Sequence, residues 1–182
     1  MKFLKYALLA STLIFASCSD DDVNTPDAVN EEEVITTLIV SLESGSDTVV
    51  MQYQDLDGDG PDAATVTYSG SLNANTVYDG SIVLLNETED PAENITEEIE
   101  EEDLDHQFFY TVGSGLDVAA EYGDADSEGN PLGLSFILNT GVASSGGLTF
   151  TLRHEPNKPN TGLENAGGET DIQVTFDITV GE

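Results

Sequence analysis

The feature that most constrains the fold of this chain is the alternation of apolar and polar residues in short segments. Near the C-terminus, apolar side chains occupy every second position from Ile172 to Val180, with polar residues between them. A period of two places all of these apolar side chains on one face of an extended strand. The same alternation recurs in further segments: Val34–Leu42, Val49–Tyr53, Val66–Tyr68, Leu116–Tyr122, Leu134–Leu138 and Leu148–Leu152.

Clusters of Gly, Asn, Asp and Pro separate these segments, as expected of turns between strands. Many short, half-buried strands with frequent turns are typical of an antiparallel sandwich or barrel. We therefore predict an all-β fold for residues 34–182, a single antiparallel, immunoglobulin-like β-sandwich of about eight to ten short strands.

The segment Leu72-Asn73-Ala74-Asn75-Thr76-Val77-Tyr78 resembles the Leu-x-Pro-x-Thr-x-Tyr corner of fibronectin type III domains, with Ala74 where that family has proline. The resemblance implies that Tyr78 begins a strand and that its hydroxyl bonds back to the preceding loop. We therefore expect one strand from Tyr78 to Leu85 rather than a hairpin that turns at Asp79-Gly80.

One segment predicts a helix instead. Asp90-Pro91-Ala92-Glu93 has the residue types of a helix start, with proline in the first turn and a capping-box glutamate. Ile95 and Ile99 share one helical face, and Glu102 and His106 continue that stripe. Acidic side chains near the end of the segment oppose the helix dipole, so we expect one short acidic helix, unless a bound cation relieves the repulsion.

The N-terminus has the order of an export signal. Residues 1–17 combine two lysines, a short apolar run and small residues, which predicts a signal peptide too short to span a bilayer. The single cysteine, Cys18, follows at once, and this order resembles a bacterial lipoprotein box, in which cleavage leaves the cysteine first and its sulfur carries lipid. The next residues resemble the signal that sends Bacteroidota lipoproteins to the outer face of the outer membrane: Ser19, Asp20, Asp21 and Asp22.

These resemblances imply a lipidated, flexible acidic tether at residues 18–33 and a location at the outer membrane, facing the cell exterior. The alternatives are an ordinary signal-peptide cysteine and a solvated acidic linker, and both still predict export. The whole chain resembles small acidic lipoproteins of flavobacteria without an assigned function. Some of these are labelled type 1 periplasmic binding fold, which implies an α/β fold that the strand pattern contradicts.

The charge of the chain restricts its partners. The sequence has 36 acidic and 4 basic residues, a formal net charge of −32, and two of the basic residues belong to the predicted signal peptide. Arg153 and Lys158 cannot neutralise a track of phosphates, so we expect no nucleic acid partner and no membrane link besides the lipid. Self-repulsion favours a monomer, and the charge admits cations, a basic surface or an outer-membrane receptor. The alternative explanation of the acidic charge is adaptation to a salty habitat, which would require no ligand.

An aspartate-rich loop is the sharpest motif for a ligand. Its Asp-x-Asp-x-Asp-Gly spacing matches the first half of an EF-hand loop, but the twelfth position is Val66 rather than glutamate. The loop therefore resembles the aspartate-rich calcium loops between strands of extracellular β domains, and a plain polar turn is the alternative. The predicted calcium ligands are Asp55, Asp57, Asp59 and Asp62.

Two other groups of residues could bind metal. A second alternation of acids, at Asp124, Asp126 and Glu128, is followed by Gly-Asn-Pro, and here a plain turn is favoured. The histidines form the alternative site: Glu102 and His106 are four residues apart, and His154-Glu155 follows a strand. If the fold brings His106 and His154 together, two imidazoles with carboxylates suit zinc or copper.

The sequence has no Gly-x-Ser-x-Gly elbow, phosphate loop or His-Glu-x-x-His motif, so we expect no enzyme. The first hypothesis is a surface-exposed binding or adhesion module with a calcium-stabilised aspartate loop. The alternative is an accessory lipoprotein that captures metal or nutrients for an outer-membrane uptake system through His106 and His154. A hydrolase is the third hypothesis.

Overall fold

The computed structural model describes residues 33–58 and 60–181. All of them belong to one compact unit, which begins at Glu32. The predicted signal peptide, Cys18 with its export motif, and Asp59 of the aspartate loop lie outside the described residues.

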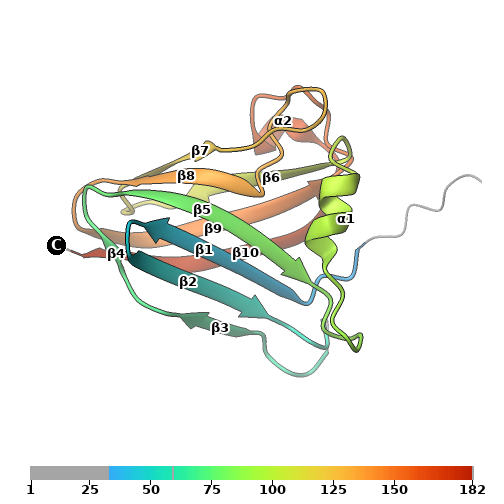
Figure 1. Ribbon diagram of the computed structural model, residues 1–182, viewed down its shortest axis with the longest axis horizontal. Coiled ribbons are helices and arrows are strands. Elements are labelled where there is room, and N and C mark those ends of the chain that lie inside the picture. The colour runs from blue at the N-terminus through green and yellow to red at the C-terminus, as the bar shows by residue number, and fades with distance from the viewer. Residues whose placement is uncertain (1–32, 59, 182) are drawn as a thin grey trace, which may run out of the picture. The chain divides into compact units, whose positions relative to one another are not determined.

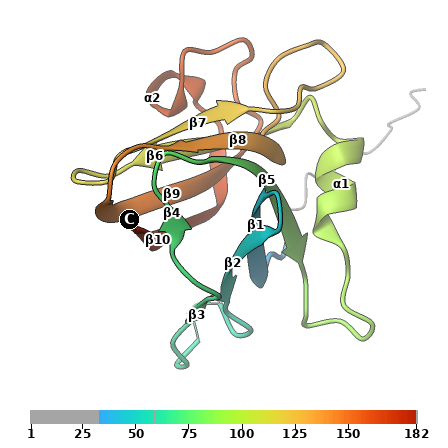
Figure 2. The ribbon, with the colours of Figure 1, turned by 60° about the vertical axis from the view of Figure 1, so that its left-hand side comes forward.

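The described residues form an all-β sandwich of two sheets, as the alternation predicts (Figures 1 and 2). The larger sheet has the strand order β3 (Thr65–Tyr68), β2 (Asp47–Gln54), β1 (Thr37–Ser44), β5 (Val77–Leu85), β8 (Ser135–Thr140) and β7 (Val118–Tyr122). The smaller sheet has the order β4 (Leu72–Asn73), β10 (Glu169–Gly181), β9 (Ser144–His154) and β6 (His106–Val112). Within these sheets every pair is antiparallel except β4 with β10.

The inner faces of the two sheets share one apolar core. In β10 every second residue from Ile172 to Val180 is buried, as the sequence pattern requires. The sheets meet through aromatic rings, since Phe136 of β8 and Phe150 of β9 lie with their ring centroids 5.7 Å apart. A single core spanning both sheets explains how the unit folds without a disulfide.

The tyrosine corner is present as the resemblance implies. β5 continues through Asp79 and Gly80 as one strand, and Tyr78 is fully buried. The Tyr78 hydroxyl accepts a hydrogen bond from the backbone N–H of Asn73 at 2.9 Å and donates one to Asp47 Oδ2 at 2.9 Å. The hydroxyl thereby joins β5 to the short strand β4 that precedes it and to β2.

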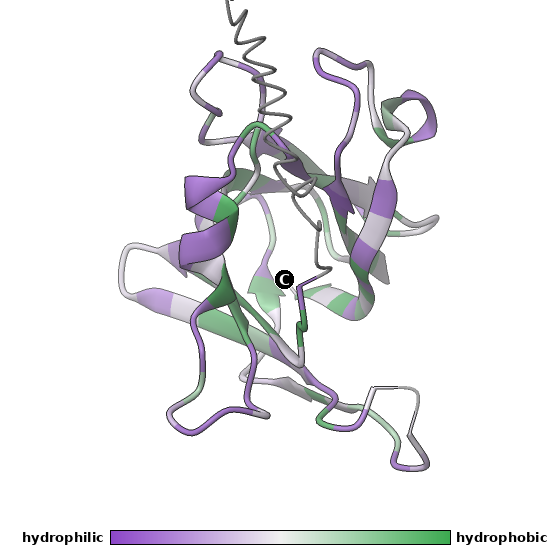
Figure 3. Cartoon of the chain, turned by 90° about the vertical axis from the view of Figure 1, so that its right-hand side faces the viewer, coloured by the Kyte–Doolittle hydropathy of each residue, from purple (hydrophilic) through white to green (hydrophobic). Residues whose placement is uncertain are grey.

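Two short helices lie outside the sheets, one more than predicted. α1 (Ile95–Glu101) packs beside β5 through buried Ile95 and Ile99, and Figure 3 shows it as mostly hydrophilic. α2 (Leu163–Ala166) is a single turn. Among the described residues, neither helix is long and apolar enough to cross a membrane.

The predicted continuation of the α1 stripe to His106 is wrong. The helix ends at Glu101, no basic residue lies in its last turn, and the chain turns before His106 begins β6. The acidic end opposes the helix dipole, and the aromatic run Phe108-Phe109-Tyr110 favours a strand. β6 was not predicted, because its residues do not alternate between apolar and polar types.

Candidate metal centre

The two histidines lie directly opposite each other on neighbouring strands. His106 begins β6 and His154 ends β9, and the register pairs them. Directly opposite residues of an antiparallel pair bring their side chains to the same face of the sheet. Both side chains are buried, and their ring centroids are 4.6 Å apart. The sequence could not show whether His106 and His154 lie close together, and the structure shows that they do.

A β-bulge in β10 brings a carboxylate to this pair. The register of β10 with β9 shifts between Thr170 and Ile172, so Asp171 is the inserted residue. Bulges re-aim a side chain and are common beside functional sites. The Asp171 carboxylate is 1% exposed, and its Oδ1 lies 3.8 Å from Nδ1 of His154.

The segment that leads into β1 supplies a second carboxylate. Glu33 Oε1 lies 3.0 Å from His106 Nε2, and Glu33 Oε2 lies 3.5 Å from His154 Nδ1. The sequence analysis assigned Glu33 to the tether, whereas in the structure its side chain is only 6% exposed and it belongs to the compact unit. One ligand atom from each of four residues lies within 4.8 Å of the others: Glu33, His106, His154 and Asp171.

The hydrogen bond on the far side of His106 determines which ring nitrogen faces the carboxylates. His106 Nδ1 lies 3.1 Å from the carbonyl oxygen of Glu102, which can only accept, so Nδ1 carries the hydrogen. A neutral ring then directs the lone pair of Nε2 at the oxygen of Glu33, a contact that a proton or a metal ion must bridge. Within the described residues, His106 Nε2 and Glu33 Oε2 are buried and make no hydrogen bond. A carbonyl that fixes the tautomer is typical of metal-binding histidines.

Two buried carboxylates in one site require positive charge nearby. Lys158, the single lysine among residues 33–58 and 60–181, has other partners: its Nζ donates to Asp126 Oδ2 at 3.0 Å and to the backbone oxygens of Asp103 and His106. Protonated imidazoles or a bound cation would balance the charge. The buried cluster of Glu33, His106, His154 and Asp171 can therefore hold a metal ion.

The carboxylates that the sequence placed beside the histidines lie elsewhere. Glu102 contributes its backbone oxygen, and its side chain is exposed, because His106 is on a strand rather than one helical turn away. Glu155 is exposed too, in a left-handed backbone conformation with φ of 48°. The two histidines belong to the cluster and these two glutamates do not.

The described part of the predicted calcium loop forms a small pocket after β2. Asp55, Asp57 and Asp62 line this pocket of about 170 Å³. Asp57 Oδ2 accepts the backbone N–H of Asp62 at 3.1 Å, and Asp55 Oδ2 accepts the Tyr53 hydroxyl at 3.1 Å. Asp55 Oδ1 is buried and has no hydrogen bond among the described residues. A neighbouring pocket of about 400 Å³ is lined by both Asp55 and Asp171, so the loop lies beside the histidine cluster.

The second acidic motif braces a turn. Asp124 accepts the backbone N–H groups of Gly133 and Ser135 at 2.6 and 2.7 Å, while Asp126 accepts Lys158 and the N–H of Asn130. The pKa of Asp126 is lowered: burial alone would raise it, but the bonds from Asn130 and Lys158 outweigh that effect. Glu128 is exposed. These acids have separate partners and do not share a ligand position in the described structure.

Sequence reasoning missed two members of the cluster, Glu33 and Asp171. Glu33 ends a run of three glutamates that reads as solvated, and Asp171 precedes the alternating strand by one residue. The sequence offered one signal: Asp171 directly precedes the strongly alternating segment from Ile172 to Val180, and this strand pairs with β9, which ends at His154. Comparisons of the chain with protein-family models, with curated proteins and with solved structures give no match.

Proposed function

We propose that the folded unit binds one first-row divalent transition metal, with zinc as the first choice, at Glu33, His106, His154 and Asp171. The convergence of four ligand atoms within 4.8 Å supports this proposal. Zinc takes four nitrogen, sulfur or oxygen ligands in a tetrahedron. Two neutral imidazoles and two carboxylates would form such a set, and their charge of −2 would be cancelled by the ion.

The donor types favour zinc over harder cations. Calcium takes six to eight oxygen ligands, whereas half of the donors here are imidazole nitrogens. Copper(II) accepts the same donors but prefers tetragonal geometry, so it is the closest competitor. Catalytic zinc sites keep one position for water, while structural sites have four protein ligands. The four buried side chains therefore favour binding or structural stabilisation over catalysis.

The proposed setting is the cell surface. In this proposal Cys18 carries the lipid, residues 19–22 direct the chain to the exterior of the outer membrane, and the unit captures or retains metal there, beside an outer-membrane receptor. A net charge of −32 draws cations toward the site. In a chain whose single cysteine is lipidated, the ion would also stabilise the fold in place of a disulfide.

The test is a calorimetric titration of zinc into a metal-stripped chain that begins at Ser19 and contains the whole compact unit. High ionic strength suppresses loose binding to the acidic surface. We expect one saturable site that is lost in His106→Gln and in His154→Gln. The matched control is Glu155→Gln, which removes an exposed carboxylate next to His154 and should leave binding unchanged. Stoichiometric binding that survives both histidine changes would contradict the proposal.

We propose calcium binding at the aspartate loop as a second function, supported by the shared pocket of Asp55, Asp57 and Asp62 and by the unbonded Asp55 Oδ1 in the described structure. An exposed loop of this kind should bind in the millimolar range of extracellular modules. A calcium titration of the same chain, compared with Asp57→Asn, tests this. Heat of binding that is equal in both proteins would rule the loop out.

A further inference from the structure

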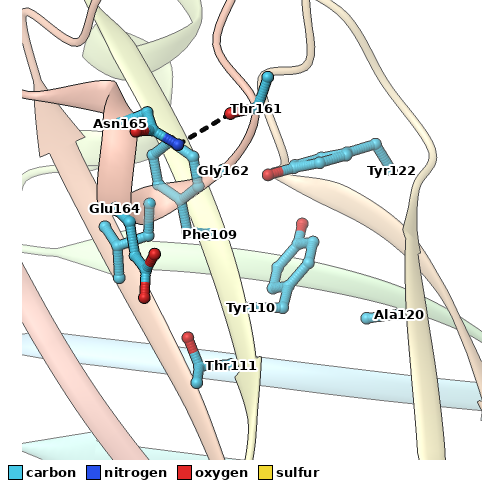
Figure 4. A pocket seen from close by; sticks show the side chains of 10 residues that line it. Phe109, Tyr110, Thr111, Ala120, Tyr122, Thr161, Gly162, Glu164 and Asn165 are labelled. Carbon is cyan, nitrogen blue, oxygen red and sulfur yellow. Dashed lines mark hydrogen bonds between the residues drawn. The ribbon is translucent and has the colours of Figure 1, made fainter.

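The open side of the sandwich contains a pocket that the metal cluster does not use. β6 is the last strand of the smaller sheet and β7 is the last strand of the larger one, so the sheets remain open between them. A pocket of about 490 Å³ lies there, lined by β6, β7 and the segment that contains α2 (Figure 4). This volume is within the range of small-ligand sites in proteins.

Aromatic rings form the walls of the pocket, and hydrogen bonds fix two of them in place. The Tyr122 hydroxyl donates to the backbone oxygen of Phe108 at 2.8 Å, and the Tyr110 hydroxyl donates to that of Gly133 at 2.5 Å. Burial raises the pKa of both tyrosines, so the rings remain neutral phenols. Their hydroxyl groups are bonded to the protein. The two rings pack on each other with centroids 5.3 Å apart, and Phe136 packs on Tyr110 at 4.9 Å, so the ring face that remains for a ligand belongs to Tyr122, which is 38% exposed.

The opposite wall is also held in place. Gln107 Nε2 donates to the Tyr122 hydroxyl at 3.3 Å, and the amide of Asn160 donates to Gln107 Oε1 at 2.7 Å. Through Gln107, these bonds join the loop before α2 to the ring of Tyr122 on β7. Asn165 Nδ2 donates to Thr161 Oγ1 at 2.9 Å across the turn, as Figure 4 shows. The pocket is therefore preformed, which lowers the ordering cost of binding.

The charge of the pocket selects among ligands. Among its described lining residues, Glu164 is the only one with a charged side chain, and neither Arg153 nor Lys158 lines it. Anionic ligands would be repelled by Glu164 and by the net charge of the chain. A neutral sugar needs several hydrogen-bond partners, whereas the tyrosine hydroxyls and Nδ2 of Asn165 already donate hydrogen bonds within the protein.

We propose that this pocket binds an organic cation, such as a quaternary ammonium group, between the exposed face of the Tyr122 ring and the carboxylate of Glu164. Cations are attracted to the negative face of an aromatic ring, and a carboxylate at the pocket wall adds to this attraction. The ring also buries the methyl groups of such a ligand. The site shares no residue with the metal cluster, so this proposal is independent of metal binding.

The test compares choline with 3,3-dimethylbutan-1-ol, its uncharged isostere, by NMR titration of the isotope-labelled chain from Ser19 in the presence of a chelator. We expect choline to shift the resonances of Tyr122 and Asn165 saturably and to bind about tenfold more tightly than the isostere. Equal affinities, or no saturation by choline at about one hundred millimolar, would overturn the proposal, as would shifts produced by methyl glucoside and not by choline.

Substitutions of Tyr122 distinguish the contribution of its aromatic ring from that of its hydroxyl, and a substitution of Glu164 tests the contribution of its charge. Tyr122→Phe keeps the aromatic face, so choline affinity should stay within about twofold, whereas Tyr122→Leu should lower it about tenfold. Glu164 is exposed, so Glu164→Gln should fold normally, weaken binding several-fold and reduce its salt dependence. Glu121→Gln, an exposed acid on β7 outside the lining, is the matched control for net charge. Equal losses in the two glutamine variants would refute the role of Glu164.

Discussion

The histidine cluster and the aspartate loop lie side by side yet are built in opposite ways. The cluster draws its residues from four distant parts of the chain and buries them between sheets. The loop takes Asp55, Asp57 and Asp62 from one short segment after β2, and the latter two are exposed. Closeness in sequence produces a recognisable motif, while burial and convergence come from strand register. The difference predicts tight metal binding at the first site and weak binding at the second.

The largest expected effect is the gain in thermal stability on metal binding. Zinc at about one thousand times its dissociation constant should stabilise the unit by about 4 kcal/mol, which corresponds to an increase in Tm of roughly 10 °C. Calcium at about its own dissociation constant should add only about 0.4 kcal/mol, or roughly 1 °C. Scanning calorimetry of the metal-stripped chain with each ion measures both. A larger shift with calcium than with zinc would reverse the ranking of the sites.

The next prediction concerns the metal-free cluster. The buried carboxylates of Glu33 and Asp171 repel each other when no cation is bound, so Glu33→Gln should stabilise the metal-free protein by about 1–3 kcal/mol. The same change should abolish zinc binding. Urea unfolding in the presence of a chelator measures the first effect. If instead protonated histidines balance the carboxylates, Glu33→Gln will be less stable than the wild type, and the site would then be an ion-pair network.

The contrast also explains which parts could be predicted from sequence. The strands with strict alternation and the Tyr78 corner are local patterns, so the all-β sandwich follows from them. β6 has aromatic residues on both faces, and its lack of alternation concealed the strand that begins at His106. Asp171 enters the site through a bulge, which shifts the register without leaving a sequence motif. The pairing of distant strands had to be seen in the structure.

A smaller effect, the pH dependence of stability, should distinguish a carboxylate that is hydrogen-bonded within the protein, such as Asp126, from carboxylates that bind a metal ion. The lowered pKa of Asp126 means that its bonds with Lys158 and Asn130 stabilise the fold above the unfolded pKa of about 3.9, and that this contribution is lost as the pH falls through the folded value. Asp126→Asn should therefore cost about 1–2 kcal/mol at pH 7 and progressively less below pH 4. Urea unfolding across that range, with and without calcium, provides the measurement. A cost that depends on calcium would make this turn a metal site.

The smallest effect tests whether the two regions cooperate. Asp55 and Asp171 line the same pocket, so the Asp55 carboxylate should attract cations on their way to the buried cluster. Asp55→Asn should slow zinc association about two- to fivefold in stopped-flow experiments at low salt and leave dissociation unchanged. The variant itself should alter the free energy of unfolding by less than about 0.5 kcal/mol, as is usual for partly exposed positions.

Asp62→Asn is the matched control for this effect. It removes the same charge from the same loop, but Asp62 does not line the pocket that Asp171 shares. If the field of the whole acidic surface attracts the ion, both variants will slow association equally, and the loop will have no special relation to the cluster. If only Asp55→Asn slows it, the aspartate motif serves the histidine site as its entrance. In that case the residues most visible in the sequence would act through residues that the sequence did not reveal.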